Sequence, residues 1–374
     1  MAWTIGAGSS GATPFAPAVG ANAISILRAA FVVGILGFIG AVTQGANVSE
    51  AVGSGLVANV SLTPMAVILA LLTAAGLMLV GIQTGIPIAT AFTVTGSVIG
   101  IGLALGGDPV WSKYLVVGGM WVLTPFVGGG VAYGLARTLA HEDVPEEFSI
   151  PLVAGVVGVV VANVNFSFLG PAGTSQSPSV AGATHLPLSP LLGRIAVTLG
   201  IGVLVTGVVV WYIRRDEEAT LRGVLLGLGS LVAFSAGGSQ VGLAVGPLVP
   251  LLDVVDIPMW AVLVGGGLGL LVGSWTGAPR MIQSLSQEYS SLGPRRSISA
   301  LVPSFAIAQA AVLLGVPVSF NEIIVSAIIG SGLAVGGSAG VSRSKLLRTV
   351  GAWIGSFVLA FSVGYGAFAL LGRM

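Results

Sequence analysis

Long apolar runs recur along this chain, and they limit its fold more than any other feature. Examples lie at 29–42, 194–213 and 259–275, and an apolar run of about 17–25 residues is long enough to cross a bilayer as a helix. Charged residues make up only 7% of the 374 residues, whereas a soluble domain carries about 25%. The sequence therefore predicts an all-α polytopic membrane protein that passes several times through the cell (cytoplasmic) membrane.

Composition also narrows the function. Glycine and proline contribute 58 and 19 residues, which membrane helices tolerate because small residues allow close packing and broken backbone can line a protected cavity. The net charge of +1 gives no indication of nucleic-acid binding. The sequence has no cysteine, no GxxxxGK[ST] motif and no metal-ligand spacing around its histidines. We therefore expect no enzyme activity, no metal and no resident cofactor.

The sequence contains an internal duplication. Residues 85–107 align without gaps with 315–337, and 7–17 align with 237–247 at the same offset. Two aromatic matches follow in the same order, Trp121 with Trp353 and Tyr133 with Tyr365. Several ordered matches at nearly one offset indicate two copies of one structural unit.

The basic residues indicate that the two copies have opposite orientations. In the second copy the loops near 276–297 and 338–348 carry Arg or Lys, whereas the stretch near 44–64 in the first copy carries neither. Because basic loops lie on the cytoplasmic side, equivalent loops face opposite sides. We therefore predict two inverted-topology repeats with broken or re-entrant helices, in roughly ten to twelve membrane elements. The first repeat spans 1–140 and is expected to be truncated at its N-terminus, 141–219 supply connecting spans and loops, and 220–374 form the second, inverted repeat.

Paired interruptions in inverted repeats indicate where a transport site lies. We expect four interruptions, at 6–14, 85–90, 236–242 and 315–321. A helix N-terminus at such a break has free N–H groups and attracts an anion without Lys or Arg. The alternative is that these Gly and Ser residues only pack helices together. The candidate substrate-binding residues are Ser9, Ser10, Thr13, Thr90, Ser239, Gln240, Ser319 and Asn321.

One carboxylate lies among these apolar segments. Glu322 follows the break at Pro317 and is predicted to lie one residue into a short helix, where the first copy has Phe92. An ionisable residue within the membrane is a functional candidate by default, so we expect Glu322 to take and release the coupling proton. Two alternatives are a carboxylate at the edge of a solvated cavity and one that caps a helix N-terminus.

These motifs, in this order, resemble the inorganic phosphate transporter (PiT) family of sodium- or proton-coupled phosphate permeases. The stretches 7–20 and 236–247 resemble the GANDxANA-like motifs of the family, and 87–92 and 317–322 resemble its PVSTTH-like motifs. The resemblance covers nearly the whole chain. It implies secondary active transport of inorganic phosphate by alternating access in an ion-coupled symport, and it leaves a homodimer open.

The resemblance also implies a divergent member of that family. Ser-Ser at 9–10 and Ser-Gln at 239–240 stand where the family has Asn-Asp, and Gly37 and Leu301 stand where it usually has acidic residues. Those carboxylates would hold sodium, so their loss disfavours Na⁺ relative to H⁺ as the coupling ion. Sulfate or another oxyanion is the alternative substrate, and a channel or a non-transporting membrane component is the alternative function.

Overall fold

A computed structural model describes residues 1–141, 145–166, 168–170 and 174–371. Within these ranges, nine helices are long and apolar enough to cross a membrane, which confirms the predicted all-α polytopic membrane fold. They are α3 (Ile26–Gln44), α5 (Pro64–Thr84), α7 (Trp111–Leu139), α10 (Pro190–Ile213), α11 (Glu217–Val245), α13 (Met259–Gln287), α14 (Pro294–Leu314), α15 (Phe320–Gly336) and α16 (Arg343–Leu371). The shorter elements are α1 (Ala2–Ile5), the π-helical turn η1 (Gly6–Ser10), α2 (Ala16–Gly20), α4 (Ala46–Ser54), α6 (Thr90–Ala104), α8 (Glu146–Val161), α9 (Pro178–Ala183), η2 (Gly246–Leu251), α12 (Leu252–Val255), η3 (Gly337–Gly340) and the antiparallel strand pair β1 (Val57–Ala58) and β2 (Asp108–Pro109).

The helix bounds reproduce the internal duplication. Both ends of α14 correspond to the ends of α5 at the offset between the two copies. Both ends of α16 correspond to those of α7 at a slightly larger offset. Both α5 and α14 start with a proline, which the first helical turn accepts because its N–H would have no partner there. Both end at a glycine in the left-handed conformation, Gly85 with φ 70° and Gly315 with φ 62°, which only glycine adopts without strain.

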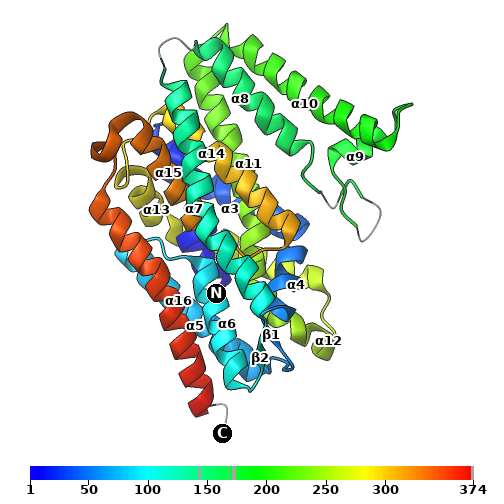
Figure 1. Ribbon diagram of the computed structural model, residues 1–374, viewed down its shortest axis with the longest axis vertical. Coiled ribbons are helices and arrows are strands. Elements are labelled where there is room, and N and C mark those ends of the chain that lie inside the picture. The colour runs from blue at the N-terminus through cyan, green and yellow to red at the C-terminus, as the bar shows by residue number, and fades with distance from the viewer. Residues whose placement is uncertain (142–144, 167, 171–173, 372–374) are drawn as a thin grey trace.

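The two repeats run in opposite directions and interlock. Figure 1 shows α7 leading away from the β1–β2 end toward α8, whereas α16 leads back toward that end. Helix α6 of the first repeat packs on α16, and α15 of the second packs on α7. A Cβ on Gly100 would lie 2.3 Å from the Phe361 carbonyl oxygen, and one on Gly330 would lie 2.0 Å from that of Gly129. These equivalent backbone contacts confirm the predicted inverted-repeat architecture.

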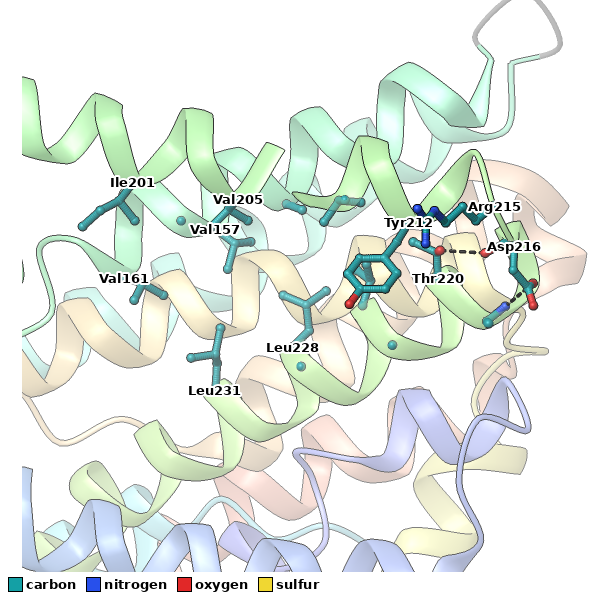
Figure 2. Close-up of a pocket in the computed structure, with 17 residues that line it drawn as sticks. Val157, Val161, Ile201, Val205, Tyr212, Arg215, Asp216, Thr220, Leu228 and Leu231 are labelled. Atoms are coloured by element: carbon teal, nitrogen blue, oxygen red, sulfur yellow. Dashed lines mark hydrogen bonds between the residues drawn. The ribbon is translucent and has the colours of Figure 1, made fainter. Parts of the chain in front are cut away.

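Helices α8, α9 and α10 lie outside the interlocked repeats, at the upper right of Figure 1. Only 6% of the most apolar window of α10 is buried. A groove of about 540 Å³ separates α8 and α10 from α11 and is lined by apolar side chains such as Val157, Val205 and Leu228 (Figure 2). At its polar end Asp216 caps α11 by accepting a hydrogen bond from the Ala219 N–H at 2.9 Å. The lining fits lipid chains better than an anion.

Two expectations about the backbone are wrong. No interruption occurs at 236–242, because α11 continues as an α-helix to Val245. The glycines there serve close helix packing, since a Cβ on Gly237 would lie 1.9 Å from the Gly37 carbonyl oxygen of α3. The stretch 276–297 is not a loop over its whole length either, because α13 is helical as far as Gln287.

Candidate functional site

The two Gly-x-Pro breaks place two helix N-termini inside the protein. After Gly85 and Gly315, a few extended residues lead to α6 and α15, and the residues that start these helices, Thr90 and Phe320, are fully buried. The first N–H groups of a helix have no intrahelical acceptor and carry the positive end of its dipole. Two such termini therefore offer hydrogen-bond donors to a buried anion.

Each break is held by the other repeat. The indole Nε1 of Trp121 on α7 donates to the Pro317 carbonyl oxygen at 3.0 Å, and that of Trp353 on α16 donates to the Pro87 carbonyl oxygen at 2.8 Å. The two bonds are equivalent under the internal duplication. Because each tryptophan crosses from one repeat to the other, the positions of the two helix N-termini depend on both repeats.

Gln240 joins three of the predicted site segments. Its side chain lies on α11, where Oε1 accepts a hydrogen bond from the Ser9 hydroxyl at 3.2 Å. Its Nε2 donates to the Val318 carbonyl oxygen, in the second break, at 2.9 Å. Ser9 and Gln240 are both completely buried. Two segments from opposite halves of the sequence therefore meet directly at the centre of the site.

Asn321 makes the equivalent connection from α15. Its Nδ2 donates to the Ile88 carbonyl oxygen at 2.7 Å and to the Gly8 carbonyl oxygen at 2.9 Å. Ile88 of the first break corresponds to Val318 of the second, so each break gives one carbonyl to an amide side chain. Both amides come from the second repeat, which makes the site asymmetric in spite of the duplicated backbone.

Several polar atoms around these bonds have no hydrogen-bond partner among the described residues. They are the hydroxyls of Thr90, Ser239 and Ser319 and the Oδ1 of Asn321, and all four residues are completely buried. A buried polar group without a partner costs about 1–3 kcal/mol. Such groups in one place indicate a ligand that supplies the missing partners, in this case one that both accepts and donates hydrogen bonds.

Two other predicted residues use their hydroxyls locally. Ser10 donates to the Ile5 carbonyl oxygen at 3.5 Å, and Thr13 donates to the Ser9 carbonyl oxygen at 3.1 Å. Both residues are buried beside the site. Their hydroxyls are bonded to backbone carbonyls of the N-terminal segment, so they shape that segment around the site.

Glu322 faces a different space. It is the third residue of α15, not the second, and it lines an apolar cavity of about 1370 Å³ between α6, α7, α15 and α16, together with Phe92 and Trp121. Ser319 and Glu322 have the spacing of a capping box, but the Ser319 side chain makes no cap bond, and Glu322 Oε2 has no partner in the described part of the chain. The helix-cap alternative is therefore not the observed arrangement.

Charge is scarce around the site. Among the described residues, Glu322 is the only acidic or basic side chain that is buried, with 1% exposure. Across the same ranges there is no group of three or more His, Cys, Asp or Glu residues that could hold a metal ion. An anion at this site would therefore be held by N–H and hydroxyl groups without Lys or Arg.

Sequence reasoning missed two buried amides near the site. Gln309 on α14 donates from Nε2 to the Ser235 hydroxyl at 2.5 Å and to Gln44 Oε1 at 3.3 Å. Gln44 at the end of α3 donates to the Asn165 carbonyl oxygen at 2.7 Å. A glutamine within an apolar span is the signal that could have identified them, because polar residues there have a structural or functional reason.

Comparisons with known proteins match nearly the whole chain. The family model described as "Phosphate transporter family" matches residues 5–364. The chain is 27% identical over 368 residues to a Pyrococcus furiosus protein whose name assigns it to the phosphate permeases, covering 90% of this chain and 85% of that protein. It is also 27% identical over 407 residues to "Inorganic phosphate transporter 2-1, chloroplastic" of Arabidopsis thaliana, covering 95% and 67%. A solved structure titled "The sodium-dependent phosphate transporter" has the same fold, with a TM-score of 0.80 and 23% identity over 100% of this chain and 96% of that one.

Proposed function

This chain belongs to the phosphate transporter family, and from this membership we propose that it carries inorganic phosphate across the cytoplasmic membrane by ion-coupled symport. One observation carries the proposal. Three buried hydroxyls without partners among the described residues, those of Thr90, Ser239 and Ser319, lie in the segments around two buried helix N-termini. These groups can hold a tetrahedral oxyanion by hydrogen bonds alone.

The free acceptor at the site favours phosphate over sulfate. Near neutral pH, phosphate keeps at least one P–OH group and can donate a hydrogen bond, whereas sulfate has acceptor oxygens only. Asn321 Oδ1 is a buried acceptor with no partner in the described ranges. Phosphate would satisfy this acceptor and sulfate would leave it unpaired, at a cost of about 1–3 kcal/mol.

The arrangement of the repeats supports transport by alternating access. The predicted site residues are at most 2% exposed, so substrate exchange requires movement of the elements around them. The breaks after α5 and α14 belong to inverted repeats and meet at one site, which suits opening to one side at a time. Substrate binding would bias the balance between outward- and inward-open states only as far as the affinities of the two states differ.

The buried residues favour protons over sodium as the coupling ion. The oxygens that line the site belong to hydroxyls, amides and carbonyls, so a sodium ion there would have neutral ligands. In the described part of the chain Glu322 is the buried carboxylate that can take up a proton, and the cavity that it lines adjoins the N-terminus of α15. We propose that protonation of Glu322 is coupled to movement of α15 and therefore to phosphate release.

Transport assays test this proposal. Uptake of labelled phosphate and of labelled sulfate is measured in proteoliposomes under separate proton and sodium gradients. We expect saturable phosphate uptake driven by the proton gradient, and loss of its pH dependence in Glu322→Gln. The exposed carboxylate variant Glu218→Gln is the matched control and keeps that dependence. Equal uptake of sulfate, uptake driven by sodium alone, or current without a coupling ion would each contradict the proposal.

A further inference from the structure

A polar cavity lies near the candidate site. This space, which we call the access cavity, has a volume of about 730 Å³ and lies between the C-terminal ends of α3, α8 and α14 and the N-terminal end of α13. Its polar lining includes Gln44, Asn47, Asn163 and Gln309, and every described residue that lines it is uncharged. It therefore offers hydrogen bonds to an anion without a fixed charge that would hold the anion tightly.

The access cavity lies at the end of the protein that has few basic residues. In Figure 1 the C-terminal end of α14 lies beside α4. The opposite end of α14 carries Arg295 and Arg296, and Lys345 lies at the start of α16. By the positive-inside rule the basic end is cytoplasmic, so the access cavity is on the non-cytoplasmic side.

Two buried amides connect the access cavity with the candidate site. Gln44 and Gln309 line the cavity and are each only 8% exposed. Gln309 Nε2 bonds to the Ser235 hydroxyl at 2.5 Å. Ser235 precedes Ser239 by four residues on α11, which is about one helical turn or 6 Å. This amide cluster and one turn of α11 therefore lead from the cavity to the Ser239 hydroxyl, which has no partner within the described ranges.

On the other side of the site, side chains of α13 and α16 hold the first break. The Gly85 carbonyl oxygen, at the tip of the first break, accepts hydrogen bonds from the Ser284 hydroxyl at 2.9 Å and from Lys345 Nζ at 3.3 Å. Lys345 also forms an ion pair with Glu288. Beside it, burial raises the pKa of the Tyr289 hydroxyl, which therefore stays neutral. These contacts hold the first break against the cytoplasmic ends of α13 and α16.

The duplication shows that the bonded pair Ser235 and Gln309 is specific to the second repeat. The first-repeat counterparts of Ser235 and Gln309 are Ile5 and Leu79, and Ile5 is completely buried. An apolar side chain therefore stands where the second repeat has the hydroxyl that bonds Gln309. At these two positions the second repeat has polar side chains and the first repeat has apolar ones.

We propose that the access cavity is where the oxyanion binds first from the non-cytoplasmic side, and that Gln44 and Gln309 form the neutral constriction it crosses to reach the transport site. This inference rests on the proposed function. The amides donate hydrogen bonds to the passing anion and then return to each other, so the constriction is polar when the anion crosses it and closed when it has passed.

Cysteine labelling tests where the cavity opens. The natural sequence has no cysteine, so single substitutions report one position each. Asn47→Cys, in the cavity lining, should react with a membrane-impermeant thiol reagent in right-side-out vesicles and be protected in inverted ones. Ser291→Cys, exposed at the opposite end, is the matched control with the reverse pattern. Reaction of Asn47→Cys only from the cytoplasmic side would overturn the proposal, whether or not the protein carries phosphate.

A second measurement tests the constriction. Gln309→Leu keeps the size of the side chain and removes its donors, whereas Gln283→Leu removes an exposed amide on α13 and is the control. We expect Gln309→Leu to lower the initial rate of phosphate uptake by about tenfold and to leave the Kd for phosphate within about twofold. Unchanged uptake, or a loss of affinity as large as the loss of rate, would overturn the assignment of Gln309 to the constriction.

Discussion

The two repeats agree in their helix bounds and differ in the side chains that they place around the site. Trp121 and Trp353 make equivalent bonds to the two breaks, and Gly100 and Gly330 make equivalent backbone contacts. These shared residues set where helices cross and where breaks lie. The duplicated positions therefore fix the arrangement of the helices and breaks, through contacts from one repeat to the other.

The positions that differ supply most of the polar side chains of the candidate site. Gln240 and Asn321 of the second repeat correspond to Ser10 and Ala91 of the first, and Glu322 corresponds to Phe92. The second repeat supplies both amide side chains and the Val318 carbonyl, and the first supplies the Gly8 and Ile88 carbonyls and the Ser9 hydroxyl as their partners. A duplicated fold can thus hold an asymmetric site, because one repeat can change its side chains while the other keeps the backbone in place.

Replacement of Asn321 by Leu should have the largest effect. Asn321→Leu leaves the buried carbonyls of Gly8 and Ile88 without their donor, and each unpaired group costs about 1–3 kcal/mol. We expect a marked drop in the midpoint of thermal unfolding and loss of phosphate binding by calorimetry. The control Gln283→Leu removes an exposed amide and should change neither. A stable Asn321→Leu protein would mean that the amides are not what joins the two repeats.

Substitution of the glycines shared by the two repeats should give the next largest loss of stability, and the loss should be equal in the two repeats. In Gly100→Ala and Gly330→Ala, the added Cβ meets a backbone oxygen at 2.3 and 2.0 Å, and such overpacking costs about 1–3 kcal/mol. Gly336→Ala, where nothing lies within 4 Å of the new Cβ, is the control on α15. Chemical denaturation of the three variants measures the comparison. A large effect at only one of the paired glycines would show that the repeats are not equivalent at these crossings.

Much of the scaffold could be predicted from the sequence. The constant offset between the copies and the two Gly-x-Pro breaks locate α5, α6, α14 and α15, because proline and a left-handed glycine end helices in a defined way. A Gly/Ser cluster is a less specific indication of a helix break. In η1 and the turn after it the cluster ends a helix, whereas at 236–242 it packs α11 against α3. Which of the two occurs depends on the neighbouring helix, which the local sequence does not specify.

The hydrogen bonds between site residues were harder to predict than which residues belong to the site. Ser9 and Gln240 were both predicted site residues, but their bond joins positions in opposite halves of the chain. The direction of a side chain was harder still. Successive residues on a helix point about 100° apart, so Asn321 faces the first repeat while Glu322 faces the apolar cavity. A shift of one residue in the expected start of α15 is enough to exchange such directions.

The paired tryptophans should have smaller and matched effects. Trp121→Phe and Trp353→Phe each remove one donor from a proline carbonyl in a break, and a hydrogen bond contributes about 1 kcal/mol net. Trp111→Phe, on a side chain that is 69% exposed, is the control. The midpoint of thermal unfolding should fall by the same amount in both paired variants. If Trp353→Phe alone lowers phosphate uptake, the first break moves during transport and the second is static.

The smallest expected effect on stability comes from replacing the lysines at the starts of α7 and α16. Lys113 and Lys345 are equivalent in the duplication, but only Lys345 is seen to bond the Gly85 carbonyl and Glu288 among the described residues. Since Glu288 is half exposed, the pair contributes less than about 1 kcal/mol, so Lys345→Met should hardly change unfolding. It should free the first break, so that a cysteine placed at Ile86 reacts severalfold faster from the cytoplasmic side. Lys113→Met should leave that rate unchanged, and equal rates in both variants would mean that the cytoplasmic closure does not depend on Lys345.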